Sequence, residues 1–322
     1  MAGISRREML QRLGASGLVL GGAAVTARLL WDGGHPGVTR EGGVAQTRDF
    51  RIKAAAGQQP ELVIARNDQP ASLVEKAVSA LGGMRRFISR GDVVVVKPNI
   101  GWDRTPIQAA NTNPLVVAAV VRLCLDAGAK KVVVTDASCN EPGRCFTRSG
   151  IWKAAYDVGA DVILPAAHRF RGMRLKGEVL DDWPVYTPLV EADKVINVPV
   201  AKHHNLAKYT AAMKNWYGAL GGRRNRLHQN IDVSIADLAG FVQPTLIVVD
   251  ATRVLLRNGP QGGNVADAKD MSTVIATTDQ VAADACGCEL IGRTAAEIPY
   301  IVMGHARGLG TMHWRDKRVA EI

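Results

Sequence analysis

The sequence predicts an α/β fold with a mainly parallel sheet, helices on both faces and a ligand crevice at the carboxyl edge of the strands. From about residue 49, short runs rich in β-branched residues alternate with helical segments, which is the pattern of strands joined by crossover helices. Most of these runs are apolar throughout, as expected for strands that are covered on both faces. Polar residues directly follow the runs, and open sheets of this class bind ligands outside the carboxyl ends of their strands.

The expected elements have recognisable ends. Asn113 and Pro114 form an N-cap followed by proline at the first helical position, and Gly128 ends the helix that they begin. Glycines also follow the other two helical segments. The predicted strands are 93–96, 132–135, 161–164, 195–198, 246–249 and 273–277, and the predicted helices are 114–127, 149–158 and 205–220.

Size and composition limit the class of protein. The chain has 322 residues, of which 47% are hydrophobic, so residues 49–322 can bury a full core as one α/β domain or as two closely packed subdomains. The net charge of +10 would allow nucleic-acid binding. However, the sequence has no aromatic-interleaved RNA motif, zinc-finger spacing or recognisable helix-turn-helix. We therefore expect no nucleic-acid partner.

Residues 1–27 have the pattern of a twin-arginine export signal. Arg6 and Arg7 precede a weakly hydrophobic, Gly/Ala-rich run that is too short for a stable transmembrane anchor. Residues 28–48 then resemble a flexible linker. The alternative is a cytosolic basic N-terminal helix. We expect the twin-arginine export machinery to carry the folded protein to the periplasm or the cell exterior. Proteins that use this route often fold with a cofactor already inserted.

The segment from Lys194 to Ile231 contains no Asp or Glu but seven Lys or Arg residues and three of the seven histidines. A field of one sign usually attracts something, so this segment is typical of a wall that holds an anion. The alternative is a solvated basic helix face. If 205–220 is a helix, its polar face consists of His204, Lys208, Ala211 and Asn215.

We expect one composite pocket where the strands end. Lys97, Lys202 and Lys214 would hold a carboxylate or phosphate group as point charges. Imidazole titrates near neutral pH, so His204 and His228 would be metal ligands or general acid and base. Lys202 is the third catalytic candidate.

Other residues complete this expected pocket. The Gly-rich loop 259–263 either cradles an anion through its backbone amides or is an ordinary surface loop. The remaining candidates are Asn99, Asn215, Gly262 and Gly263 for the substrate, and Asp250, Asp279 and Asp284 for a metal ion.

The five cysteines allow different interpretations. Cys124 lies in the apolar part of a predicted helix and is assigned to the core. Cys139 and Cys145 flank a loop, and in an oxidising compartment they could form a disulfide or stay as free thiols. Alternatively, they could ligate a metal or cluster together with Cys286 or Cys288, although the spacings match no established cluster motif.

Several short motifs occur together in a fixed order. They are Lys97-Pro98-Asn99, Asn113-Pro114, residues 199–204, residues 214–218, Leu227-His228, residues 247–250, residues 259–263, and Asp279 with Asp284. Over roughly residues 60–312, this order resembles the domain of unknown function 362 family. The resemblance implies no settled reaction. Some members carry a ferredoxin-type segment whose C-x2-C-x2-C-x3-C run is missing here, so electron transfer is not implied.

The sequence as a whole favours a metal- or cofactor-dependent enzyme that acts on a small anionic substrate. Redox chemistry is slightly favoured over hydrolysis by the export route and the family resemblance, because no Ser-His-Asp or G-x-S-x-G signature is present. The cofactor is left open, with a metal ion or an iron–sulfur cluster as candidates. The alternatives are a non-catalytic anion- or metal-binding protein and a docking partner in an exported redox complex.

Overall fold

The computed structural model describes residues 49–52 and 59–322. The predicted signal segment and linker, residues 1–27 and 28–48, lie outside the described residues. In the part described, none of the helices is both long enough and apolar enough to cross a membrane.

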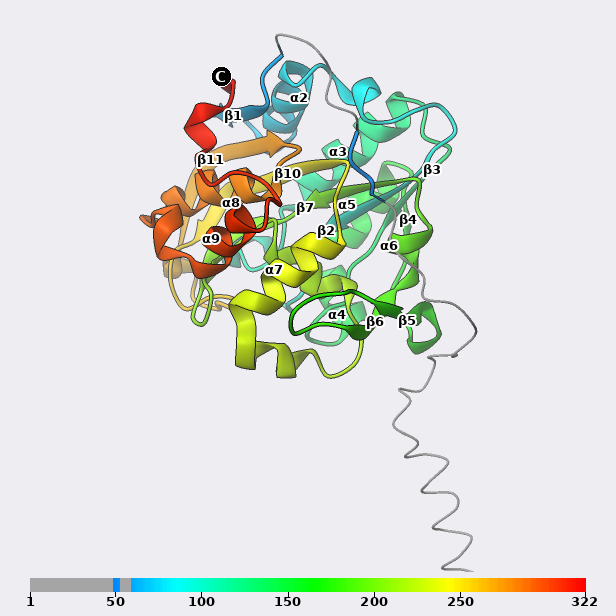
Figure 1. The fold of residues 1–322 in the computed structure, drawn as a ribbon. Coiled ribbons are helices and arrows are strands. Elements are labelled where there is room, and N and C mark those ends of the chain that lie inside the picture. The colour runs from blue at the N-terminus through cyan, green and yellow to red at the C-terminus, as the bar shows by residue number, and fades with distance from the viewer. Residues whose placement is uncertain (1–48, 53–58) are drawn as a thin grey trace, which may run out of the picture.

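A large sheet forms the centre of the fold, with strand order β12-β1-β11-β10-β7-β2-β3-β4 (Figure 1). The strands from β10 to β4 are parallel, β11 is antiparallel to both of its neighbours, and β8 pairs with β10 and β9. The α/β fold with a mainly parallel sheet is therefore confirmed. The strands are β1 (Leu62–Arg66), β2 (Val93–Pro98), β3 (Lys131–Val134), β4 (Asp161–Val162), β7 (Lys194–Val198), β8 (Val200–His204), β9 (Lys208–Thr210), β10 (Leu246–Leu255), β11 (Ala268–Thr277) and β12 (Val319–Glu321), with β5 (Phe170–Arg174) and β6 (Asp182–Tyr186) in a separate hairpin.

Helices cover both faces of the sheet, as the apolar strands predict (Figure 1). In β2, Val94 and Val96 belong to the apolar cluster under α2, α3 and α5, whereas Val95 belongs to the cluster under α7, α8 and α9. This alternation is the two-residue period of a strand, here with both faces buried. The helices are α2 (Pro70–Ala80), α3 (Pro114–Asp126), α4 (Pro142–Arg148), α5 (Ile151–Asp157), α6 (Thr187–Glu191), α7 (Ile231–Phe241), α8 (Gln280–Gly287) and α9 (Pro299–Ala306).

The ends of two predicted helices can be compared with the structure. The Asn113 side chain accepts a hydrogen bond from Leu115 N–H, and α3 begins at Pro114 as its cap predicts. The helix predicted over 149–158 is shorter, because Gly150 has a φ of 73° and separates α4 from α5. Two strands are longer than predicted, since β10 and β11 each have 10 residues.

The helix predicted over 205–220 is wrong. The chain instead makes a hairpin of β8 and β9, followed by a 3-10 helix over Lys214–Ala219. In the turn after β8, the His204 ring Nδ1 accepts hydrogen bonds from the backbone N–H groups of Leu206 and Ala207. These side-chain contacts replace the helical hydrogen bonds, and Lys208 points outward with its Nζ bonded to the Glu297 carbonyl.

Candidate functional site

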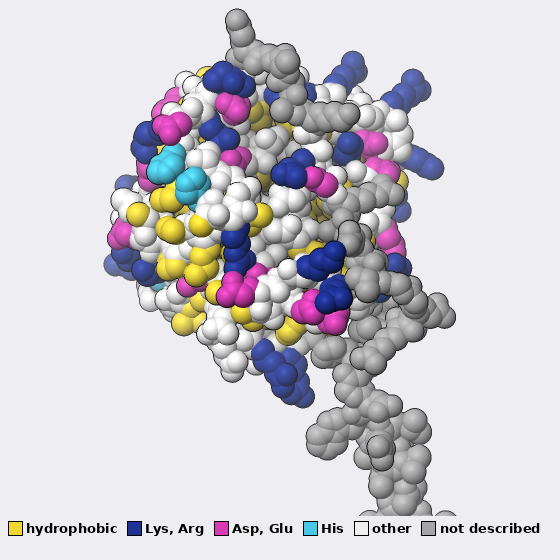
Figure 2. All heavy atoms as spheres, in the orientation of Figure 1, with side chains coloured by type: hydrophobic (Ala, Val, Ile, Leu, Met, Phe, Trp, Pro, Cys, Tyr) yellow, Lys and Arg dark blue, Asp and Glu magenta, His cyan; other side chains and the backbone are white. Residues whose placement is uncertain are grey.

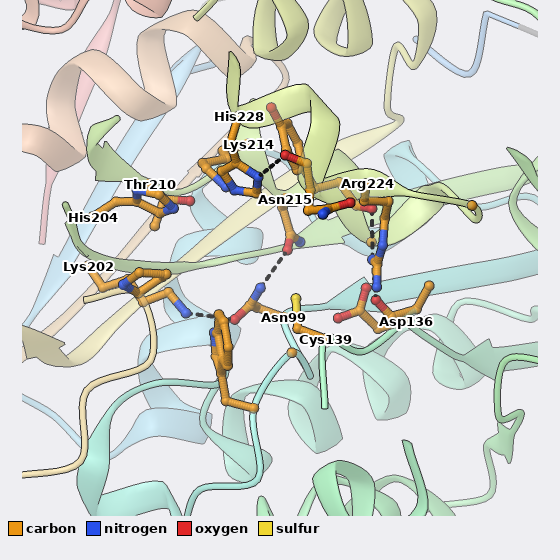
Figure 3. A pocket seen from close by; sticks show the side chains of 18 residues that line it. Asn99, Asp136, Cys139, Lys202, His204, Thr210, Lys214, Asn215, Arg224 and His228 are labelled. Atoms are coloured by element: carbon orange, nitrogen blue, oxygen red, sulfur yellow. Dashed lines mark hydrogen bonds between the residues drawn. The ribbon is translucent and has the colours of Figure 1, made fainter. Parts of the chain in front are cut away.

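A cavity of about 400 Å³ lies at the carboxyl ends of the central strands. β3 and β4 lie on one side of β2, whereas β7 and β10 lie on the other, so the strand order reverses at β2. Open α/β sheets form their ligand crevice at such a point. The lining residues are Asn99, Gly101, Trp102, Asp136, Ala137, Cys139, Lys202, His204, Thr210, Lys214, Asn215, Tyr217, Gly218, Gly222, Arg224, Asn225, His228 and Pro260 (Figure 3).

Lys97 does not present a free charge to this cavity, contrary to the sequence expectation. Its side chain is fully buried, and its Nζ lies 2.7 Å from Asp136 Oδ1. Burial lowers the pKa of Lys97, and the Asp136 carboxylate opposes this shift. The other Asp136 oxygen accepts a hydrogen bond from Ile100 N–H at 2.7 Å. The pair therefore forms a neutral floor under the cavity.

Gly218 allows this ion pair to lie against the backbone of the 3-10 helix. A Cβ atom at Gly218 would stand 1.8 Å from Asp136 Oδ1 and 2.7 Å from Lys97 Nζ. The Gly218 carbonyl also accepts a hydrogen bond from Ala137 N–H. The close approach of this backbone to a buried carboxylate thus requires glycine.

Lys202 is the buried cation of the cavity wall. Its side chain is almost fully buried, and its Nζ donates to Asn99 Oδ1 at 2.9 Å and to the Ala110 carbonyl (Figure 3). Burial, followed by the nearby charge of Lys214, lowers the pKa of Lys202 to about 7. No carboxylate pairs with Lys202 in the part of the chain described. An amine in this setting titrates near neutral pH.

A chain of amide groups fixes the orientation of Asn99. Its Nδ2 donates to Asn215 Oδ1 at 3.3 Å, and Asn215 Nδ2 donates to the Lys97 carbonyl and to Asn197 Oδ1 at 3.1 and 2.8 Å. Asn197 Nδ2 in turn donates to a backbone carbonyl. Because each amide donates its N–H groups along the chain, the oxygen of Asn99 must face Lys202.

Lys214 is a second lysine of the cavity with no carboxylate partner among the described residues. It is half-buried, and its Nζ lies 4.1 Å from the centre of the Tyr217 ring. Burial lowers the pKa of Lys214 to about 8. The aromatic face partly compensates the charge but leaves the ammonium hydrogens free to contact a ligand.

The two histidines of the cavity are set up as opposite tautomers. His204 Nδ1 accepts two backbone N–H bonds at 3.2 Å each, so the proton of the neutral ring must be on Nε2. Burial lowers the pKa of His204 to about 2, and therefore the ring stays neutral. His204 is thus a hydrogen-bond donor to the cavity, which does not fit the metal ligand or general base expected from the sequence.

His228 has the complementary arrangement. Its Nδ1 lies 3.2 Å from the Asn225 carbonyl, which can only accept, so Nδ1 carries the proton and Nε2 has the free lone pair. Burial lowers the pKa of His228, and the charge of Lys214 adds to this effect. The His204 and His228 rings lie 6.4 Å apart between centroids and are inclined by only 14°. His228 is therefore the candidate general base.

Arg224 was not assigned to the site from the sequence, although it lies in the acid-free segment. Its guanidinium donates to the carbonyls of Ala137 and Ser138 at 2.6 Å each and to the Tyr217 carbonyl at 3.1 Å. It therefore joins the loop after β3 to the 3-10 helix and adds positive charge to the wall. Asp136 was not assigned to the site from the sequence either, because its partner Lys97 lies 39 positions earlier in the chain.

The three aspartates expected to bind metal do not line the cavity. Asp250 lies within β10 and accepts hydrogen bonds from Asn113 N–H and from Thr252, which anchors the start of α3. Asp279 caps α8 and pairs with Lys317 at 3.0 Å. Because β11 is antiparallel to β10, its end lies at the opposite edge of the sheet from the cavity.

Asp284 positions the cavity wall instead of binding a ligand in it. Its carboxylate accepts the backbone N–H groups of Ala212 and Met213 at 2.6 and 3.0 Å, directly before Lys214. Burial raises the pKa of Asp284 to about 7. Among the described residues, no group of three or more His, Cys, Asp or Glu side chains is placed to hold a metal ion.

The glycine loop contributes to the cavity only through Pro260. The Gly263 carbonyl accepts a hydrogen bond from Gln108 at 2.8 Å, and a Cβ at Gly262 would crowd Leu255. Gly262 and Gly263 therefore do not contact the cavity, contrary to the sequence expectation. This loop is held against the hairpin by Gly259 N–H, which donates to the His203 ring.

Cys139 and Cys145 are both free thiols in the structure, so the disulfide considered from the sequence is not formed. Cys139 is exposed and lines the cavity, whereas Cys145 is buried in α4. Burial raises the pKa of the Cys145 thiol to about 11, so it remains protonated at neutral pH.

The cavity wall carries positive charge from side chains that have no carboxylate partner among the described residues. On the face seen in Figure 2, basic and acidic side chains are interspersed, as on an ordinary solvated surface. By contrast, Lys202, Lys214 and Arg224 line the cavity, and the one carboxylate there, Asp136, is already paired with Lys97. The fold and the site thus define an α/β protein with a cationic cavity at the carboxyl edge of its sheet.

The chain belongs to the family described as Domain of unknown function (DUF362), which matches residues 94–289. It is 25% identical over 239 residues to the thylakoid-associated protein sll1697 of Synechocystis sp. (strain ATCC 27184 / PCC 6803 / Kazusa), covering 71% of this chain and 72% of that protein.

Two solved structures are similar, each at 13% identity and a TM-score of 0.41. One is a protein from Thermotoga maritima, with 70% of this chain and 58% of that chain covered. The other is the lactate racemase apoprotein from Thermoanaerobacterium thermosaccharolyticum, with 81% and 61% covered. The chain therefore spans about three-fifths of the length of each of these structures.

Proposed function

We propose that the protein is an enzyme that acts on a small anionic molecule held in the cavity. The observation that carries this proposal is Lys214, which lines the cavity beside Lys202 and Arg224 and has no carboxylate partner in the part of the chain described. Buried or half-buried ammonium groups are costly without an anion beside them. A ligand carboxylate or phosphate would supply the missing negative charge.

The two histidines support catalysis over simple storage of an anion. His204 offers an Nε2–H donor that stays neutral, and His228 offers a basic Nε2 with its other nitrogen oriented by a carbonyl. A fixed donor beside a fixed acceptor can stabilise an oxygen and move a proton on the same bound molecule. The proposal does not depend on the metal or redox chemistry considered from the sequence, and the cofactor is left open.

We also propose export by the twin-arginine route to the periplasm or the cell exterior. The support for this is the sequence of residues 1–27, in particular Arg6 and Arg7.

Anion binding can be tested by calorimetric titration of the full-length protein with lactate, pyruvate, oxalate and phosphate. We expect at least one of these to bind, and Lys214→Gln to weaken binding by about tenfold or more, since a hydrogen bond to a charged group contributes roughly 1.5–3 kcal/mol. Lys208→Gln is the matched control, because Lys208 lies in the same basic segment but points to solvent. An equal loss in both variants would contradict the proposed site.

Catalysis is tested separately by following each bound anion by NMR. A change in the anion that depends on His228 supports an enzyme, and we expect His228→Ala to lose it. Tight binding with no change in any anion would favour the non-catalytic binding protein. Failure of all four anions to bind would refute the proposed function.

A further inference from the structure

Lys202 differs from the other buried lysine of the site. Lys97 has a carboxylate 2.7 Å away, which opposes the lowering of its pKa by burial. Among the residues that the structure describes, Lys202 has only neutral acceptors, the Asn99 side-chain oxygen and the Ala110 carbonyl. Both lysines are almost fully buried, so they differ in the charge of their partners and not in their exposure to water.

The two acceptors of Lys202 can receive both N–H groups of a neutral amine. A neutral amine has two N–H donors and one lone pair, whereas an ammonium group has three donors. Asn99 Oδ1 and the Ala110 carbonyl receive the two donors, and the amide chain through Asn215 prevents Asn99 from turning its NH₂ group toward Lys202. The lone pair is then left for the cavity, which the Lys202 side chain lines.

The charge of the neighbouring Lys214 also favours the neutral form of Lys202. Lys214 lines the same cavity, and its positive charge disfavours a second cation at Lys202. A lysine that is desolvated and placed beside another cation is the usual form of an amine nucleophile for carbonyl compounds. Lys214 remains available to bind a carboxylate on the same molecule.

We propose that Lys202 forms an imine with the carbonyl carbon of a small oxo acid whose carboxylate lies beside Lys214. This inference rests on the proposed function and names its substrate class. The two hydrogens of the neutral amine leave with the carbonyl oxygen as water, and a C=N bond replaces the C=O bond. No oxidant or reductant is consumed.

The residues around Lys202 can assist each part of this step. His204 Nε2–H can donate to the carbonyl oxygen as negative charge develops on it, and His228 can carry the proton that departs with water. When the imine is protonated, its single N–H can keep one of the two acceptors that the amine held, Asn99 Oδ1 or the Ala110 carbonyl. The site therefore accommodates both the amine and its product.

The test is reductive trapping on the full-length protein. The protein is incubated with pyruvate, glyoxylate or 2-oxoglutarate in the presence of sodium cyanoborohydride, and the modified lysines are mapped by peptide mass spectrometry. We expect the reduced adduct on Lys202 with at least one oxo acid. Lys97, buried but ion-paired, should remain unmodified, and the exposed Lys208 gives the background of surface labelling.

Two further measurements separate this inference from the proposed function. Lactate has the charge of pyruvate but no carbonyl group, so it should bind without forming an adduct and should slow labelling by pyruvate. Lys214→Gln should lower the labelling of Lys202 by about tenfold through the loss of one charged contact. If anions bind but Lys202 is labelled no faster than Lys208 by all three oxo acids, the imine is refuted and the proposed function stands. If neither lactate nor any oxo acid binds, the imine is refuted, and the proposed function is refuted as well when oxalate and phosphate also fail to bind.

Discussion

The ion pair between Lys97 and Asp136 gives the most quantitative prediction. Both side chains are essentially excluded from water, with exposures of 0% and 2% and an N–O distance of 2.7 Å. Asp136→Asn keeps the shape of the side chain but leaves the Lys97 ammonium without its counter-charge. Removing one partner of a buried pair typically costs ~3–5 kcal/mol of folding free energy.

The folding free energy lost in Asp136→Asn also has an upper limit. Lys97 can lose its proton instead of remaining a buried, unpaired cation. From the ordinary pKa of 10.5, deprotonation at neutral pH costs about 5 kcal/mol, since each pKa unit is worth about 1.4 kcal/mol. The expected loss, ~3–5 kcal/mol, is a large part of the roughly 5–15 kcal/mol that stabilises a typical domain.

The loss of folding stability in Asp136→Asn should become smaller as pH rises. In the variant, folded Lys97 has a depressed pKa, so the unfolded chain binds more protons than the folded protein. The stability lost at neutral pH is therefore regained as pH rises toward the unfolded pKa of 10.5, because the variant lacks the Asp136 charge that opposes the lowering of the Lys97 pKa by burial.

Urea unfolding of the full-length protein at neutral and alkaline pH measures both effects. The matched control is Asp157→Asn, which breaks the exposed pair with Lys153, whose side chains are 81% and 51% exposed for Lys153 and Asp157. An exposed i,i+4 pair contributes only about 0.3–0.5 kcal/mol. If Asp136→Asn costs no more than Asp157→Asn, or if its cost does not fall with rising pH, the buried ion pair described here is not what stabilises the cavity floor.

Three further predictions follow from the site and the sequence. The affinity for lactate should fall as pH rises through about 8, because Lys214, with a pKa of about 8, then loses the proton that attracts an anion; calorimetry across this range measures it, and a constant affinity would count against Lys214 as the anion-binding group. Gly218→Ala should destabilise the protein by about 1–3 kcal/mol in urea, since its Cβ would stand 1.8 Å from a carboxylate oxygen, and a neutral substitution would contradict that close approach. Replacing both Arg6 and Arg7 by Lys should retain the protein in the cytoplasm on cell fractionation, whereas normal export would exclude the twin-arginine route.

The sequence alone predicted the class of fold and much of the cavity. Apolar β-branched runs indicated parallel strands buried on both faces, and Asn113 with Pro114 marked the start of α3 correctly. The acid-free segment also predicted a wall of positive charge. Several expected site residues do line one cavity, namely Asn99, Cys139, Lys202, His204, Lys214, Asn215 and His228. The sequence could place these elements and side chains because their positions depend on local pattern and on the shared direction of neighbouring strands.

Strand direction and strand length decided where the aspartates lie. A run such as 273–277 has the same local pattern in a parallel or an antiparallel strand, so only the pairing of β11 with β10 shows that Asp279 is at the far edge. Similarly, β10 continues five residues past Asp250, which makes Asp250 an anchor for α3 and not a strand end.

Long-range contacts also decided the chemistry of the individual side chains. Periodicity suggested a helix over 205–220, but pairing with β10 and the bonds to the His204 ring make this segment a hairpin. The same bonds place the proton of His204 on Nε2, and a carboxylate 39 residues away in sequence neutralises Lys97 but not Lys202. Protonation state depends on burial and on partners within a few ångströms, and for these residues the partners come from distant parts of the chain that only the tertiary fold brings together.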